Sequence, residues 1–268
     1  MTILGRDRHL HAACFDELDE ALRALGVADT VFLNAHEFSV PEDGVVYNLE
    51  NVGLQVSPHA FEGHVVWDFS ARNVTAFRHH RQTVAGKVVL HVPVGYHPTM
   101  ERFAKVPSSE CAYDVAFCGA MNVRRYTILS ALQRAGLRVL VVPHHLYGLE
   151  RDRLLAQSRL ALGILFYPDG LHTVLRTAHC TANRLPILSE YAPEAPAWAL
   201  LQVGYDGYVD RAVELVRRRR EVLDAIADAQ YVVFRMHPMT LPAIEPGAAK
   251  SVSRALERSG DVPEGVLS

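Results

Sequence analysis

The segment CGAMNVRR, which ends at Arg125, combines residue types that could bind an anion. It follows an apolar run and precedes a helical pattern, and Gly119 permits the sharp turn that ends a strand. A helix starting near Arg124 would point its first amides into this loop, which is a favourable place for an anion. Asn122, Arg124 and Arg125 add polar and cationic groups, and a guanidinium can make paired hydrogen bonds to phosphate. The segment therefore predicts a phosphate contact, the alternative being two arginines that face solvent.

Two later loops show the same arrangement of a strand, a polar turn and a helix. In the first, Gly148 indicates a tight turn that a ligand could approach closely, and Tyr147 could flank a base or a sugar. In the second, His172 and Arg176 are one turn apart in a predicted helix over 171–182 and are expected to share a face. Arg176 lies on an otherwise apolar helix, which predicts an anionic partner for it.

Glu190 ends the strand predicted over 185–190. Its carboxylate could accept hydrogen bonds from ribose hydroxyls, and the alternative is a capping or surface carboxylate. Neither a P-loop nor a GxGxxG fingerprint occurs in the sequence. Any nucleotide site therefore has to rest on the loops described above.

Polar residues also end the strands predicted in the first half of the chain. They include Glu37, Glu50, Asp68 and His97. In an open parallel sheet, ligands bind beyond the carboxyl ends of the strands, so these residues predict one edge of a cleft. For Glu50 and Asp68 the alternative is capping of a following helix, together with Ser70 and Asn73.

The elements that position these residues alternate between strands and helices, which predicts an α/β fold. Expected strands cover 30–35, 44–50, 64–70, 87–93, 113–119, 137–143, 160–167 and 185–190, and expected helices cover 14–25, 71–85, 124–135, 149–157, 171–182 and 207–228. The polar stretch 101–112 is typical of a linker. The pattern predicts two doubly wound, Rossmann-like parallel-sheet domains that face a cleft. The expected limits are 1–105 and 106–235, with a tail over 236–268 that packs back or is partly disordered.

The composition is that of an ordinary water-soluble chain and excludes several classes of protein. Its 268 residues are 49% hydrophobic and 21% charged, with a net charge of −3, which argues against nucleic-acid binding over the whole surface. The four cysteines form no CxxC pair, and no membrane-spanning run or signal peptide is recognisable, so a cytoplasmic location is expected. The fourteen histidines show no metal-binding spacing, and the arginines at 217–220 suggest a solvated helix face.

Three stretches, DVAFCGAMNVRR, YGLERDRLL and LRTAHCTANRLPILSE, together resemble the nucleotide-binding half of GT-B-type glycosyltransferases related to the spore-maturation group. The upstream stretches VVYNLENV, VVWDFSARNV and VPVGYHP are similar to the acceptor-side half. The resemblance covers roughly residues 30–235. It implies transfer of a sugar from a nucleotide-sugar donor, expected to be a nucleoside diphosphate sugar, with no metal or other cofactor required.

The resemblance also implies roles for individual residues. Gly119, Asn122, Arg125 and Arg176 would lie by the diphosphate, Tyr147 and Gly148 by the base or ribose, and Glu190 by the ribose. Thr173 stands where the family pattern has a glutamate that contacts the donor, and the adjacent His172 could replace it. An inverting reaction needs a base, for which Asp68 is preferred over Glu50 and His97. A retaining reaction needs no such base.

The predicted acceptor is a small molecule, a glycan or a protein, and membrane insertion is not expected. One alternative is a module that binds a sugar or nucleotide without catalysis, in keeping with Thr173. Another is a glycosyltransferase that acts on modified bases of DNA or RNA. An oxidoreductase is a weaker alternative, because the glycine fingerprint is missing.

Overall fold

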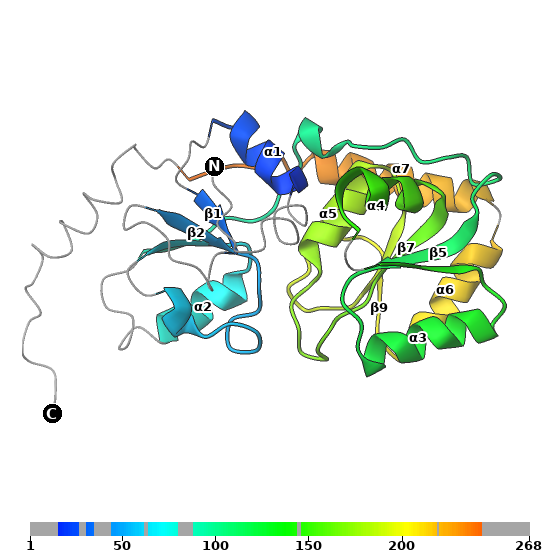
Figure 1. Cartoon of the computed structure of the whole chain (residues 1–268), viewed down its shortest axis with the longest axis horizontal. Helices are drawn as coiled ribbons and strands as arrows, with labels where there is room; N and C mark the ends of the chain where they lie inside the picture. Colours follow the sequence, from blue (N-terminus) through cyan, green and yellow to red (C-terminus); the bar gives the residue numbers. More distant parts are fainter. Residues whose placement is uncertain are drawn as a thin grey trace, which may run out of the picture. The chain divides into compact units, whose positions relative to one another are not determined.

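The structure is a computed structural model, and it describes residues 16–26, 31–34, 44–61, 64–79, 88–143, 146–218 and 220–242. The chain divides into two compact units, each described here by itself (Figure 1). Unit 1 holds the described residues within 27–92 and residues 241–242, and unit 2 holds those within 7–26 and 93–240. This division concerns packing, and the domain limits expected at residues 105 and 235 stay predictions.

Unit 1 is built on a four-stranded parallel sheet in the order β1-β2-β3-β4. The strands are β1 (Val31–Leu33), β2 (Val45–Asn48), β3 (Val65–Asp68) and β4 (Val89–His91). The helix α2 (Ala71–His79) packs on this sheet, because its Phe77 joins an apolar cluster with Phe32, Val46 and Val66. The short helix η2 (Pro58–Phe61) adds Phe61 to the same cluster.

Unit 2 is built on a five-stranded parallel sheet in the order β6-β5-β7-β8-β9. The strands are β5 (Tyr113–Cys118), β6 (Val139–Val142), β7 (Ser158–Gly163), β8 (Ile187–Glu190) and β9 (Gln202–Val203). The helices are α1 (Asp16–Ala24), α3 (Val123–Arg134), α4 (Gly148–Ala156), α5 (Val174–Ala182), α6 (Tyr208–Arg217) and α7 (Arg220–Arg235), with the short helix η3 (Pro98–Met100).

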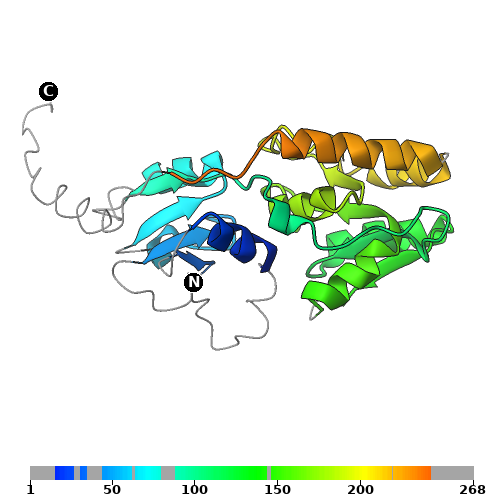
Figure 2. The ribbon, with the colours of Figure 1, turned by 90° about the horizontal axis from the view of Figure 1, so that it is seen from above.

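Helices cover both faces of the unit 2 sheet. Successive side chains of a strand point to opposite faces, so Val115 and Phe117 of β5 pack with α3 and α6, while Ala116 packs with α4 and α5. Figure 1 shows α4, α5 and α7 on one side of the sheet and α3 and α6 on the other. Figure 2 shows the same ribbon from above, with the long α7 in orange. The predicted α/β class with two parallel sheets is confirmed, whereas the cleft stays a prediction.

Three features of unit 2 differ from the sequence-based expectations. The helix expected over 207–228 is two helices, because α6 ends at Arg217 and α7 starts at Arg220. The expected linker 101–112 packs on unit 2, where the amides of Arg102 and Phe103 both donate to Asn183 Oδ1. The strand β9 was not expected at all. Within the described residues, no helix is both long and apolar enough to cross a membrane.

Candidate functional site

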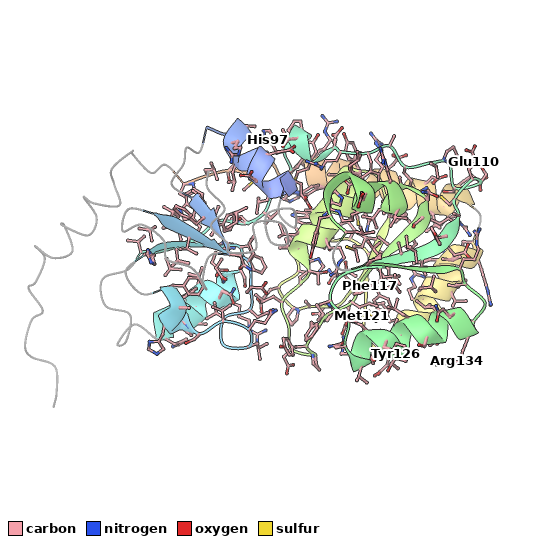
Figure 3. All side chains as sticks on the ribbon, in the orientation of Figure 1. His97, Glu110, Phe117, Met121, Tyr126 and Arg134 are labelled. Carbon is pink, nitrogen blue, oxygen red and sulfur yellow. The ribbon has the colours of Figure 1, made fainter. Side chains whose placement is uncertain are left out.

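The candidate site lies at the carboxyl ends of three neighbouring strands in unit 2. Gly119 follows β5, Ile164 follows β7, and Glu190 is the last residue of β8. Figure 3 labels Phe117 near the end of β5 and Met121 in the loop that leads into α3. Because the three strands are adjacent and parallel, their loops meet at one edge of the sheet, which is where such folds bind ligands.

Asn122 caps the start of α3. Its Oδ1 accepts a hydrogen bond from the Arg125 amide at 3.0 Å, and its Nδ2 donates to the Phe166 carbonyl at 2.7 Å. The side chain thus satisfies a free helix amide and holds a neighbouring loop, with one donated and one accepted hydrogen bond inside the protein. The structure therefore gives Asn122 a positioning role, and its predicted contact with a diphosphate is untested.

Arg125 is buried and connects the loops that follow β5 and β7. Its guanidinium donates to the Ile164 carbonyl at 2.7 and 3.1 Å and to the Ala120 carbonyl at 2.6 Å. Burial, together with the charges of Arg176 and Arg124, lowers the pKa of Arg125 to about 9. Its hydrogen bonds are made to carbonyl oxygens and to no carboxylate among the described residues, and Glu190, which is paired with Arg124, acts on its charge without a hydrogen bond.

Arg124 forms a partly buried, two-point ion pair with Glu190. Arg124 also donates to the Leu165 carbonyl at 3.1 Å and lies 3.9 Å from the centre of the Tyr205 ring. Glu190 accepts a further hydrogen bond from the Leu165 amide at 3.0 Å. The carboxylate expected at a ribose is thus bound to an arginine of the same chain, and it is neither a surface residue nor a helix cap. Its predicted ribose contact is untested.

Arg176, in the first turn of α5, has no hydrogen-bond or ion-pair partner among the described residues, and its Nη1 is fully covered. The guanidinium carbon lies 5.0 Å from the centre of the Phe117 ring. Burial lowers the pKa of Arg176, since it disfavours the charged form. Thr173, the N-cap of α5, makes no side-chain cap hydrogen bond. A cation and an uncapped helix start therefore lie at one place, which can bind an anion.

Gly119 makes room for this arginine. Its backbone φ of +150° is rarely adopted by other residues, and a Cβ there would collide with Nη2 of Arg176. We expect Gly119→Ala to destabilise the protein by roughly 1–3 kcal/mol and to displace the guanidinium. Urea unfolding measures the first effect. Gly136→Ala is the matched control, because Gly136 also has a positive φ but nothing lies near its Cβ. An equal loss in both variants would contradict the predicted contact.

The sequence predicted that His172 and Arg176 share a helix face. This prediction is wrong, because α5 begins at Val174 and His172 lies before it. His172 instead lies in the preceding loop and is 5% exposed, with its Nε2 at 3.0 Å from Thr177 Oγ1. Its Nδ1 and the hydroxyl of Thr173 are buried without partners. Burial and the Arg176 charge lower the pKa of His172 to about 4. The ring is therefore neutral at ordinary pH.

Tyr147 and Gly148 lie at the start of α4. Gly148 has a φ of +54°, which fits the tight turn expected from the sequence, and Tyr147 is the N-cap without a side-chain cap bond. The contact of Tyr147 and Gly148 with a base or ribose stays a prediction.

The preferred base, Asp68, is completely buried at the end of β3. Its two oxygens accept hydrogen bonds from Asn48 Nδ2 at 2.7 Å, from the Ser70 amide at 2.8 Å and from Asn73 Nδ2 at 3.1 Å. These contacts match the structural alternative, in which Asp68 supports the start of α2. Glu50 belongs to the same polar group, since its backbone carbonyl accepts from Asn48 and Asn73.

His97, the third candidate base, belongs to unit 2 and is labelled in Figure 3. It caps η3, where its Nδ1 accepts from the Thr99 amide at 3.3 Å. Glu37 lies outside the described residues. The role of Asp68, Glu50 or His97 as a base therefore stays a prediction.

Asp68 should make the stability of unit 1 depend on pH. Burial raises its pKa to about 7, against the opposing hydrogen bonds from Asn48, Ser70 and Asn73. Because the folded chain then binds the proton more tightly than the unfolded chain, stability is highest below pH 4. It falls by up to about 4 kcal/mol as pH rises through 7. Urea unfolding followed by Trp67 fluorescence in a Trp198→Phe background measures this.

In the same background Asp68→Asn should remove the pH dependence, whereas the exposed Asp210→Asn should leave it unchanged. A wild-type stability that rises between pH 4 and 7 would show that the hydrogen bonds outweigh burial and keep the carboxyl ionised.

The structure reveals a buried charge cluster that sequence reasoning missed. Asp152 Oδ1 accepts from Arg151 Nε at 2.9 Å and from His179 Nε2 at 2.8 Å, and Arg151 contacts Glu17 of α1 at 3.3 Å. Its members come from α1, α4 and α5, far apart in the sequence. No local pattern could have signalled the cluster, because charged residues at a helix start are usually exposed.

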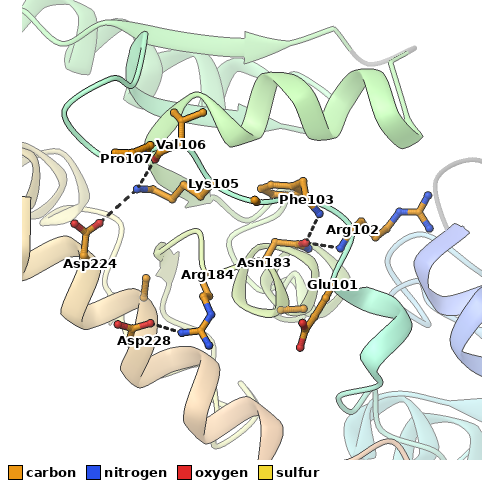
Figure 4. Close-up of a pocket in the computed structure, with 13 residues that line it drawn as sticks. Glu101, Arg102, Phe103, Lys105, Val106, Pro107, Asn183, Arg184, Asp224 and Asp228 are labelled. Carbon is orange, nitrogen blue, oxygen red and sulfur yellow. Dashed lines mark hydrogen bonds and ion pairs between the residues drawn. The ribbon is translucent and has the colours of Figure 1, made fainter.

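A cavity of about 640 Å³ lies elsewhere in unit 2 (Figure 4). Its walls are formed by residues 101–107, by the turn after α5 and by α7. The charges there are already paired: Lys105 lies 3.5 Å from Asp224, and Arg184 contacts Asp228. None of the predicted site residues lines it. The cavity is therefore separate from the candidate site and has no uncompensated charge for an ion.

Within the described residues, no three or more His, Cys, Asp or Glu side chains group together as metal ligands would. The residues that could meet a ligand at the candidate site are thus Arg176, the start of α5, and the unpaired groups of His172 and Thr173. This arrangement can bind an anion beside uncharged polar groups.

No known family model matches the chain. Two uncharacterised proteins of Acanthamoeba polyphaga mimivirus are similar to parts of it. One is 29% identical over 108 residues, which cover 38% of this chain and 34% of that protein. The other is 32% identical over 79 residues, which cover 29% of this chain and 9% of that protein. The chain thus spans about a third of the length of the first relative and about a tenth of the second.

Three solved structures show partial similarity. A DNA-modifying β-glucosyltransferase, whose substrate is uridine diphosphoglucose, has a TM-score of 0.46 at 10% identity and covers 85% of this chain and 79% of its own. An accessory secretory protein structure from Streptococcus pneumoniae has a TM-score of 0.45 at 9% identity, and the match covers 92% of this chain and 57% of that chain. The glycosyltransferase of kitacinnamycin has a TM-score of 0.37 at 12% identity, and the match covers 96% of this chain and 85% of that chain. Similarity at this level does not establish a function for this chain.

Proposed function

We propose that this protein is a glycosyltransferase that binds a nucleotide-sugar donor at the carboxyl edge of the unit 2 sheet, without a metal ion. One observation carries the proposal: Arg176 is a largely buried cation with no anionic partner among the described residues. A buried charge is costly unless a partner compensates it, so an anionic ligand is the expected partner. The resemblance of the surrounding loops to GT-B enzymes supports a diphosphate as that anion.

The chemistry follows from what these groups can do. When the sugar leaves the donor, negative charge develops on the departing diphosphate. Arg176 and the first turn of α5, where the Thr173 side chain makes no cap hydrogen bond, would stabilise that charge, which is the role that a metal ion has in other enzymes. Arg125 adds a second positive charge. It lies close enough to Arg176 for the charge of Arg176 to lower the pKa of Arg125, although the hydrogen bonds of Arg125 are made to carbonyls. The acceptor would be a hydroxyl of a small molecule, glycan or protein.

A second candidate function is a nucleotide-binding module without catalysis. The observation that favours it is the state of Asp68, which has no exposed surface and whose oxygens both accept hydrogen bonds within unit 1. An inverting transfer would need a base other than this carboxylate. A retaining transfer would not.

A thermal-shift screen of nucleoside diphosphates and nucleotide-sugars, with a chelator present, tests the proposal. A ligand at 100 times its dissociation constant should stabilise the protein by about 2.7 kcal/mol. Stabilisation by one nucleotide class, followed by slow hydrolysis of the nucleotide-sugar, would support a transferase. Stabilisation without hydrolysis or transfer would favour the binding module. If no nucleotide stabilises the folded protein, the proposed site is wrong.

A further inference from the structure

His172 has one ring nitrogen that is hydrogen-bonded and one that is not. The side chain is 5% exposed and directly precedes Thr173, the N-cap of α5. Its Nε2 lies 3.0 Å from Thr177 Oγ1, while its Nδ1 is buried without a partner. The unpaired nitrogen can be a donor or an acceptor, and the neighbouring bonds decide which.

The hydroxyl of Thr177 favours one tautomer of His172. That hydroxyl has one hydrogen, and it lies 3.1 Å from the Thr173 carbonyl, which can only accept. If the hydroxyl donates to this carbonyl, it must accept from Nε2–H, so both contacts are hydrogen bonds and Nδ1 has a free lone pair. In the opposite tautomer one of these bonds is lost, and a buried Nδ1–H would be unpaired near the positive charge of Arg176. The Nε2–H tautomer is therefore favoured.

We propose that His172 Nδ1 accepts a hydrogen bond from a hydroxyl of the bound donor, next to the phosphate oxygen that Arg176 binds. This inference rests on the proposed function. The phosphate oxygens of a diphosphate ester carry no hydrogen at neutral pH and cannot satisfy Nδ1, whereas a sugar hydroxyl can. The hydroxyl can belong to the ribose or to the transferred sugar. His172 is then a residue that selects hydroxylated ligands, and it compensates for the missing glutamate at Thr173.

Two further observations agree with an acceptor. The pKa of His172, lowered by burial and by Arg176, keeps the ring neutral, so it does not attract phosphate as a cation. Arg176 is the charged group whose field lowers the pKa of the His172 ring. The hydroxyls of Thr177 and Ser189, which lie 3.4 Å apart, are uncharged. Because Nδ1 and Arg176 Nη1 are both covered, the donor must displace part of what covers them.

The test compares three probes, a nucleoside diphosphate, its 2′-deoxy form and the nucleotide-sugar, by calorimetry on the full chain. His172→Phe, which removes the acceptor, should weaken binding roughly 10-fold. Thr177→Val should weaken binding similarly, because without the hydroxyl nothing holds His172 in the Nε2–H tautomer. Thr177→Ser keeps the hydroxyl and should bind as the wild type does. A loss for the diphosphate that is absent for its 2′-deoxy form assigns the hydroxyl to the ribose. A loss confined to the nucleotide-sugar assigns it to the transferred sugar.

The failures are distinguishable. If the wild type binds and His172→Phe binds all three probes equally well, the inference alone is wrong. If the wild type binds none of them, the proposed function fails and the inference with it. Long-range ¹H–¹⁵N spectra of the free protein should show His172 with its hydrogen on Nε2, and a hydrogen on Nδ1 would overturn the argument. A second result would also overturn the argument. If the affinity for the nucleotide-sugar falls with rising pH in the wild type but not in His172→Phe, the His172 ring binds as a cation.

Discussion

Arg176→Met should weaken the binding of a nucleoside diphosphate by roughly 10- to 100-fold, since hydrogen bonds to a charged group contribute about 1.5–3 kcal/mol. The same variant should be more stable than the wild type when no ligand is present. Methionine fills a similar volume, and it removes a buried cation that has no partner among the described residues. Opposite changes in stability and affinity are expected of a residue kept for binding.

Calorimetry measures the affinity, and urea unfolding without ligand measures the stability. Arg217→Met is the matched control, because this exposed arginine at the end of α6 donates to the Ala135 carbonyl, far along α3 from Asn122. It should change neither quantity appreciably. A folded Arg176→Met protein with unchanged affinity would show that Arg176 does not bind the ligand. A loss of stability without ligand would show that the arginine is a structural residue.

Glu190→Met should destabilise unit 2 by about 3–5 kcal/mol, because it leaves Arg124 buried without its partner. The side chains of Arg124 and Glu190 are 15% and 4% exposed, so water cannot replace the lost carboxylate fully. The double variant Arg124→Met/Glu190→Met should regain most of this stability, since no unpaired charge remains. Urea unfolding followed by Trp198 fluorescence in a Trp67→Phe background measures all three proteins.

The double variant also separates the two roles considered for Glu190. If its carboxylate only holds Arg124 and the Leu165 amide, the stable double variant should bind nucleotides nearly as the wild type does. A large loss of affinity in that variant would instead support a contact with the ribose. Equal stability of the single and double variants would contradict the predicted coupling of the pair.

The sequence predicted the fold class because local patterns report it directly. Short β-branched runs alternate with helical patterns, and each of the expected strand ranges contains or overlaps a strand of the structure, whereas β9 lies outside all of them. The main errors came from tertiary contacts. The helix expected over 207–228 breaks near Arg218, and residues 101–112 were expected as a linker although Asn183 holds Arg102 and Phe103 against unit 2.

The sequence by itself determined which loops carry polar and charged residues, because glycine turns and helix starts have local signatures. It could not determine which cation is free. Arg124, Arg125 and Arg176 look alike in sequence, but the first pairs with Glu190 and the second bonds to the carbonyls that follow β5 and β7. Of these three arginines, Arg176 alone has no hydrogen-bond or ion-pair partner among the described residues. That distinction depends on Ile164 and Glu190, which are 39 residues from Arg125 and 66 residues from Arg124 in the sequence. Only the folded sheet brings them to the same edge.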